Sequence, residues 1–346
     1  MEPRLIVSGS QDKTVRLWRE TKKLFTFERV GNLRPILEVL KFLSAEEVMG
    51  IARVNKQFYE ASFHSEVVKP VFRQANILEG HTDFVRSVAV SLKKGILVSA
   101  SDDSTILVWS LATAQVTQVL QGHSDAVFSV AISSDGEWLV SGSEDKTLRV
   151  WSLASGLTTQ VLEGHSHYVR SVAISSKDQF IVSSSYDTTL RVWSLTTGKK
   201  IRVLEGHSHW VNSVAISKTD QYIVSGSRDS TVRVWSLTSG DLIKVLQRYG
   251  SIVWSVAISS DEQFVISGSG DGTIRVWSLT SGETTQVLRG HTGFVLSVKL
   301  SSDDKYLVSG GGGDVDYSVR VWDLSTGKQT QELRGHTGNV WSVNLI

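Results

Sequence analysis

Serine, histidine and aspartate recur together along this chain, and these residue types are the components of a hydrolase triad. One set consists of His123, Ser141 and Asp145, followed by Trp151, and the same spacing returns in most later segments. A catalytic triad is needed once, whereas a buried hydrogen-bond chain that joins a loop to two strands is needed in every structural unit. We therefore interpret these residues as structural and keep a hydrolase as a third hypothesis. Because the histidines belong to separate units, we expect no metal and no cofactor.

The unit that carries these residues extends over Gly122–Leu162. Its short apolar segments alternate with small residues and are separated by Gly, Ser and Asp, which is typical of four short antiparallel strands. The tryptophans stand 42 residues apart, at Trp109, Trp151, Trp193, Trp235 and Trp277. The preceding Gly-His step keeps the same register, at His81, His123, His165, His207 and His291.

With these motifs the chain resembles the WD-repeat family, whose period and Gly-His and Trp signature it shares. Ser replaces Asp after most of the tryptophans, and the full Trp322-Asp323 pair occurs once. Seven segments read as the first strand of a unit, beginning at Val85, Val127, Val169, Val211, Val253, Val295 and Val340. The resemblance implies an all-β fold, a seven-bladed β-propeller with a small α-helical insertion.

Both ends of the chain contribute to the last blade. Leu5–Ser10, Thr14–Trp18 and Lys23–Phe27 match the second, third and fourth strands of a unit, while the matching first strand begins at Val340 near the other end. Ring closure by strands from both termini removes sheet edges that would otherwise pair with other chains. We expect residues 1–29 to supply the closing blade, residues 30–77 a helical insert, and residues 78–346 the remaining blades.

The insert lacks the turn residues of the repeats, and its apolar residues fall at helical spacing. The first stretch contains Ile36, Leu37, Leu40 and Leu43. Ser44 with Glu47 forms a capping box, which predicts that a further helix begins there. We expect three or four short helices.

The insert resembles an F-box, the helical module that docks a Skp-type adaptor of cullin ubiquitin ligases. The resemblance rests on Val39–Ser44, Val48, Ala52–Tyr59 and Ser62, with Gly31-Asn32 where the family usually opens with Leu-Pro. It implies that the adaptor-binding residues are Val39, Leu40, Leu43, Val54 and Phe58. A helical insertion with its own small core, in a general WD-repeat scaffold, remains the alternative.

Composition limits the classes of partner. The 346 residues include 36 basic and 35 acidic residues, with a net charge of +1 and no cysteine. A balanced charge provides no field that would attract nucleic acid or a membrane surface, so neither is expected as a partner. The start of the chain does not read as a signal peptide, and no apolar run reaches the length of a membrane span. We expect a cytoplasmic or nuclear protein.

Residues that break the repeat are the candidates for binding. They stand beside the first valine of the inner strands or just before the turn aspartate, positions that face one end of the ring in the family. The candidate partner-binding residues are Arg86, Phe128, Tyr168, Arg170, Tyr186, Trp210, Asn212, Arg228, Trp254 and Trp341. Aromatic and Arg side chains are enriched in binding hot spots, although we expect about half of these rings only to pack across the channel mouth. We expect a non-enzymatic receptor for a target peptide, with Arg170 and Arg228 holding an acidic or phosphorylated residue.

Overall fold

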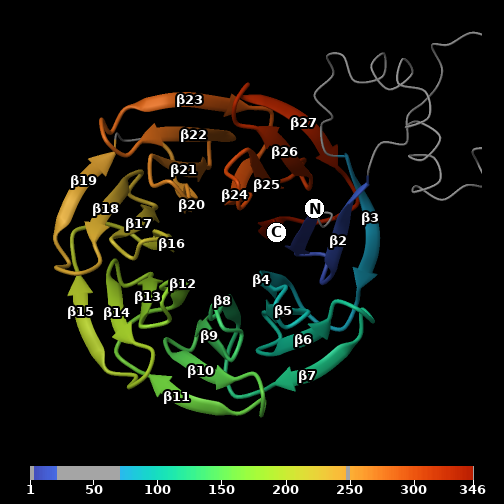
Figure 1. Cartoon of the computed structure of the whole chain (residues 1–346), viewed down its shortest axis with the longest axis vertical. Coiled ribbons are helices and arrows are strands. Elements are labelled where there is room, and N and C mark those ends of the chain that lie inside the picture. The colour runs from blue at the N-terminus through green and yellow to red at the C-terminus, as the bar shows by residue number, and fades with distance from the viewer. Residues whose placement is uncertain (1–3, 22–70, 247–249, 346) are drawn as a thin grey trace, which may run out of the picture. The chain divides into compact units, whose positions relative to one another are not determined.

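The computed structural model of the chain describes residues 4–21, 71–246 and 250–345, and within these ranges it contains strands and turns but no helix. Nearly all of the strand residues belong to one of the two units into which the chain divides. The strands form seven four-stranded sheets arranged around a central axis, with the first strand of each sheet innermost (Figure 1). The seven-bladed propeller expected from the repeats is confirmed.

Six blades consist of four strands that are consecutive in the chain. The first three are β4 (Val85–Ser91), β5 (Ile96–Ser101), β6 (Ile106–Ser110) and β7 (Val116–Leu120); β8 (Val127–Ile132), β9 (Trp138–Ser143), β10 (Leu148–Ser152) and β11 (Thr158–Leu162); and β12 (Val169–Ile174), β13 (Phe180–Ser185), β14 (Leu190–Ser194) and β15 (Lys200–Leu204). The next three are β16 (Val211–Ile216), β17 (Tyr222–Ser227), β18 (Val232–Ser236) and β19 (Leu242–Leu246); β20 (Val253–Ile258), β21 (Phe264–Ser269), β22 (Thr273–Ser278) and β23 (Thr284–Arg289); and β24 (Phe294–Leu300), β25 (Tyr306–Gly312), β26 (Val319–Asp323) and β27 (Lys328–Leu333).

The seventh blade joins the two ends of the chain. Its strands, from the inside outward, are β28 (Val340–Leu345), β1 (Leu5–Ser10), β2 (Val15–Thr21) and β3 (Val71–Leu78). The innermost strand β28 pairs antiparallel with β1, with Leu345 opposite Ile6 and Val343 opposite Ser8. Closure of the ring by the C-terminal strand therefore follows the prediction.

The outer strand of this blade differs from the prediction. The structure places β3 (Val71–Leu78) there, and Lys23–Phe27 lies outside the described residues. The sequence contains a sign of this strand position. Leu78-Glu79-Gly80-His81 repeats the Leu162-Glu163-Gly164-His165 step, which marks the end of the fourth strand in a regular blade. The extra residues thus enter between the third and fourth strands of the closing blade and not after the fourth, and the expected insert limit at residue 77 is wrong.

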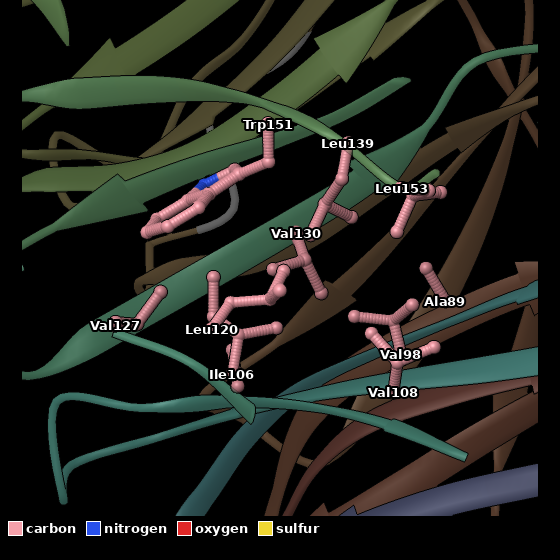
Figure 2. Packing of buried hydrophobic residues seen from close by; sticks show 11 residues of the cluster. Ala89, Val98, Ile106, Val108, Leu120, Val127, Val130, Leu139, Trp151 and Leu153 are labelled. Carbon is pink, nitrogen blue, oxygen red and sulfur yellow. The ribbon is translucent and has the colours of Figure 1, made fainter. Parts of the chain in front are cut away.

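The core of the propeller lies between neighbouring blades. Figure 2 shows one such cluster, in which Trp151 and Leu139 of one blade pack against Ile106 and Leu120 of the preceding blade. Truncating a fully buried tryptophan costs about 3–5 kcal/mol, so the repeated Trp is a principal source of stability in each blade. Packing is close: a Cβ at Gly142 would lie 2.7 Å from Cγ1 of Val169 on the next inner strand.

Candidate functional site

The Ser, His and Asp residues of a blade form one hydrogen-bond chain with the tryptophan. Nε2 of His123 lies 2.7 Å from Oγ of Ser141, and the Trp151 indole N–H donates to the same oxygen at 2.8 Å. The other ring nitrogen of His123 lies 2.7 Å from the Asp145 carboxylate. The network assigns the Nδ1–H tautomer, because the Ser141 hydroxyl then donates to Nε2 while it accepts from the indole. Ser141 has no exposed surface, which fits a structural chain better than a nucleophile.

Five other blades contain the same chain, built on His81, His165, His207, His291 and His336. Burial lowers the pKa of four of these rings, and the hydrogen bond to aspartate offsets this shift only in part. The four rings are those of His165, His207, His291 and His336. Burial alone would raise the pKa of Asp145, but hydrogen bonds from His123 and Thr147 hold it well below its usual range. The neutral ring and ionised carboxylate are thus parts of the fold.

Residues that break the repeat meet at one end of the ring. Arg86, on inner strand β4, donates from Nε and Nη2 to the two carboxylate oxygens of Asp102, at 2.7 and 2.5 Å. Its guanidinium also lies 4.5 Å from the centre of the Trp341 ring. A guanidinium that is paired in this way is already neutralised, so Arg86 is a support of the channel mouth and not a free anchor.

Arg170 is also engaged. Its guanidinium lies 4.9 Å from the Phe128 ring centre and 5.5 Å from that of Trp341. Burial lowers the pKa of Arg170, and the neighbouring Tyr186 hydroxyl opposes this shift. The structure thus covers one of the two arginines that we expected to hold an anion.

Three more predicted residues pack around the channel mouth. Trp341, which comes from the C-terminal strand β28, lies 6.5 Å from Trp254 between ring centres. Asn212 is buried and donates from Nδ2 to the carbonyl of Val253 at 2.9 Å. These three side chains therefore pack against other groups of the propeller.

The remaining candidates form a continuous strip on two adjacent blades. The rings of Tyr186 and Trp210 are stacked, with centres 4.1 Å apart and planes at 8°. On the other side of Tyr186, the ring centre of Tyr168 lies 5.8 Å from that of Tyr186. The guanidinium of Arg228 lies 4.7 Å from the Trp210 ring centre. We call Tyr168, Tyr186 and Trp210 the aromatic strip. Arg228 is exposed at the Trp210 end of the strip, and it contacts no carboxylate within the described part of the chain.

The other predicted sites have different outcomes. The expected adaptor-binding residues, Val39, Leu40, Leu43, Val54 and Phe58, lie outside the described residues. Within the described ranges, no group of three or more His, Asp or Glu residues is placed to hold a metal ion. No helix in these ranges is long and apolar enough to span a membrane.

The repeats match one family model along most of the chain. The model is the WD domain, G-beta repeat, and the matched residues are 2–19, 72–110, 114–152, 156–194, 198–236, 240–278 and 282–323. The chain belongs to the WD-repeat family. As in the structure, the match breaks off after residue 19 and resumes at residue 72 within the closing blade, which supports the position found for the insertion.

Individual relatives resemble one stretch of this WD-repeat chain. Ribosome biogenesis protein BOP1 homolog of Drosophila melanogaster is 48% identical over 42 residues, which are 12% of this chain and 5% of the relative. The homolog of Drosophila erecta matches to the same extent, and that of Drosophila persimilis is 51% identical over 39 residues, 11% of this chain and 5% of the relative. The matched segment spans a twentieth of these relatives, about one WD repeat.

Two further residues of the WD-repeat face, which the sequence did not single out, stand two positions after the repeat histidine. Asp125 and His167 occupy this position on adjacent blades, and the His167 ring lies 4.3 Å from Tyr168. A hydrogen bond to Glu144, together with the charges of Glu144 and Asp125, raises the pKa of Tyr168. A comparison from blade to blade of the position two residues after the repeat histidine would have singled it out, because its residue type changes while the framework residues do not.

Proposed function

We propose that this WD-repeat protein is a non-enzymatic receptor that holds a peptide segment of another protein on the aromatic strip. The observation that carries the proposal is Arg228, an exposed guanidinium stacked on Trp210 without a carboxylate partner among the described residues. Trp, Tyr and Arg are the side chains most enriched in binding hot spots. Repeated framework residues are structural, so a binding function belongs to positions where the blades differ.

The chemistry of the strip favours an acidic or phosphorylated residue beside an apolar one. The guanidinium of Arg228 can donate charge-assisted hydrogen bonds to an anion, while the rings of Tyr186 and Trp210 remove apolar surface from water. Arg170 is not an anchor in this proposal, because its guanidinium already packs against the rings of Phe128 and Trp341. Affinity should fall as salt is added.

The test uses peptides selected from a random phage-displayed library on the immobilised full chain. Replacing Arg228 by Ala should weaken a selected peptide about tenfold, since a hydrogen bond to a charged group contributes about 1.5 kcal/mol. Lys199→Ala is the matched control, because it removes one exposed positive charge in the turn after β14, at the opposite end of the ring. If neither Arg228→Ala nor Trp210→Ala changes the affinity of any selected peptide, the binding face lies elsewhere.

We further propose that the protein is the substrate-recognition subunit of a Skp–cullin ubiquitin ligase. The support is the F-box-like pattern of Val39–Ser44 and Ala52–Tyr59 in the sequence. Co-purification with a Skp-type adaptor tests this, and Val39→Asp combined with Leu43→Asp should abolish it while the propeller stays folded. Absence of adaptor binding by the folded wild-type protein at micromolar concentration would favour a general WD-repeat scaffold.

The role named for the relatives, ribosome biogenesis, does not support a closer assignment. Their similarity extends over a single repeat, a level of likeness that WD repeats of unrelated function can share. We also propose a cytoplasmic or nuclear location, where an adaptor and its targets would meet the protein. Fluorescence microscopy of the tagged full chain tests this location.

A further inference from the structure

The aromatic strip ends in opposite charges. Arg228 lies over Trp210 at one end. At the other end, Asp125 accepts the Ala126 N–H at 2.8 Å, and the backbone N–H of Glu144 donates to the Ala126 carbonyl at 2.9 Å. These two bonds hold both acidic residues beside Ala126. We call Asp125 and Glu144 the acidic pair.

The acidic pair is continuous with the strip. The Tyr168 ring lies 6.1 Å from that of Phe128, which belongs to the same blade as the acidic pair, and Glu144 and Asp125 raise the pKa of the Tyr168 hydroxyl. A carboxylate accepts several hydrogen bonds, so Asp125 and Glu144 can both accept from a basic side chain of a ligand. Asp125 is exposed. A ligand that covers Tyr168 would therefore meet negative charge at its edge.

Nearby charges do not cancel this pattern. The Arg86 guanidinium is paired with Asp102, and Arg170 is covered by aromatic rings. The exposed Lys146 follows the acidic pair in the chain and has no carboxylate contact in the described ranges. One lysine against two carboxylates leaves this end negative.

The length of the strip sets the spacing that a ligand must satisfy. The steps from Tyr168 to Tyr186, from Tyr186 to Trp210 and from Trp210 to the Arg228 guanidinium are 5.8, 4.1 and 4.7 Å. An extended peptide rises about 3.3 Å per residue, so about four residues cover the strip.

We propose that the strip selects a bipolar peptide segment, with a Lys or Arg side chain on Asp125 and Glu144 and an acidic or phosphorylated residue on Arg228, at least about four residues apart and with apolar residues between. This inference rests on the proposed function and adds the order of the charged residues along the bound peptide. Opposite charges at the two ends also fix the direction in which the chain lies, because the reversed order places like charges together.

The experiment is a parallel selection from the random phage-displayed library on wild type and on Asp125→Asn with Glu144→Gln. Wild type should enrich a basic residue at the predicted spacing from an acidic one. The double variant should lose the basic preference but keep the acidic one, and a synthetic peptide of the wild-type consensus should bind it about tenfold more weakly. The control, Asp241→Asn with Glu283→Gln, removes two exposed acidic charges from turns at the opposite end of the ring and should leave selection and affinity unchanged.

The outcomes separate the two proposals. Selected peptides that depend on Trp210 and Arg228 but show no basic residue would overturn the charge order and leave the receptor proposal in place. Peptides that are insensitive to Trp210, Arg228 and the acidic pair would overturn both. Each variant's fold is checked by its circular dichroism spectrum and thermal midpoint. If the double variant Asp125→Asn with Glu144→Gln is unstable, Glu144→Gln alone replaces it in the experiment.

Discussion

Tyr186 and Trp210 lie face to face, with ring centres 4.1 Å apart and planes at 8°, although they come from adjacent blades. Tyr186 follows β13, and Trp210 precedes inner strand β16. The stack joins the two blades at the surface, outside the core that the repeated residues build. It gives the candidate binding surface a rigid centre, because each ring restrains the other.

The stack should be measurable as a coupling between the two residues. We predict that a double-mutant cycle of Tyr186→Ala and Trp210→Ala gives an interaction energy of about 0.5–1.5 kcal/mol, the usual range for aromatic pairs. Urea unfolding of wild type, both single variants and the double variant supplies the four free energies. Strictly additive effects would show that the rings do not interact in solution.

The buried serine of each blade should be a stability residue. Ser141→Ala leaves the Trp151 indole N–H and the His123 ring without their shared partner, so we expect a loss of about 1–3 kcal/mol in unfolding free energy. Ser155→Ala, in an exposed turn of the same blade, is the control and should change stability by less than about 0.5 kcal/mol. An esterase activity that disappears in Ser141→Ala would contradict the structural role.

The C-terminal strand should hold the whole ring closed. Leu345 is 5% exposed and lies opposite Ile6, so Leu345→Ala should cost about 2–5 kcal/mol. Deleting Leu345-Ile346 should lower the thermal midpoint further, because the deletion also removes part of the ladder between β28 and β1. Scanning calorimetry gives both values. A midpoint that stays at the wild-type temperature after the deletion would mean that β28 does not close the ring.

Acid should destabilise the propeller in two ranges of pH, one set by histidines and one by aspartates. The folded-state pKa is lowered in His165, His207, His291 and His336, so the unfolded chain binds more protons once the pH falls below the ordinary histidine value of about 6.5. The stabilisation is complete above that pH and declines below it, by up to about 1.4 kcal/mol per pH unit for each ring that stays neutral. Aspartates such as Asp145, whose pKa is also lowered, add a further loss below about pH 4.

Urea midpoints measured between about pH 7.5 and pH 5 test this dependence. His207→Gln keeps a polar side chain but cannot titrate, so it should reduce the slope of stability against pH as well as the stability itself. Equal midpoints at both ends of the range would rule out neutral buried histidines as the cause.

The sequence by itself determined the features that each repeat specifies locally. The constant spacing of residues such as Trp151 and Trp193 predicted seven blades, and the lone first strand at Val340 predicted closure from both ends. The four-residue chain of His123 and its partners was also predictable, because its members stand at fixed offsets within one blade. Period and alternation are properties of neighbouring residues, so no tertiary structure is needed to see them.

Only the tertiary structure decided which residues of the binding face are free. Arg86, Arg170 and Arg228 look alike in the sequence, yet Asp102 neutralises the first, rings from two other strands cover the second, and the third is exposed. The outer strand Val71–Leu78 likewise joins β2 across a long insertion. Both outcomes depend on contacts between segments that are distant in the chain, and such contacts are set by how the blades pack around the channel and not by the local repeat.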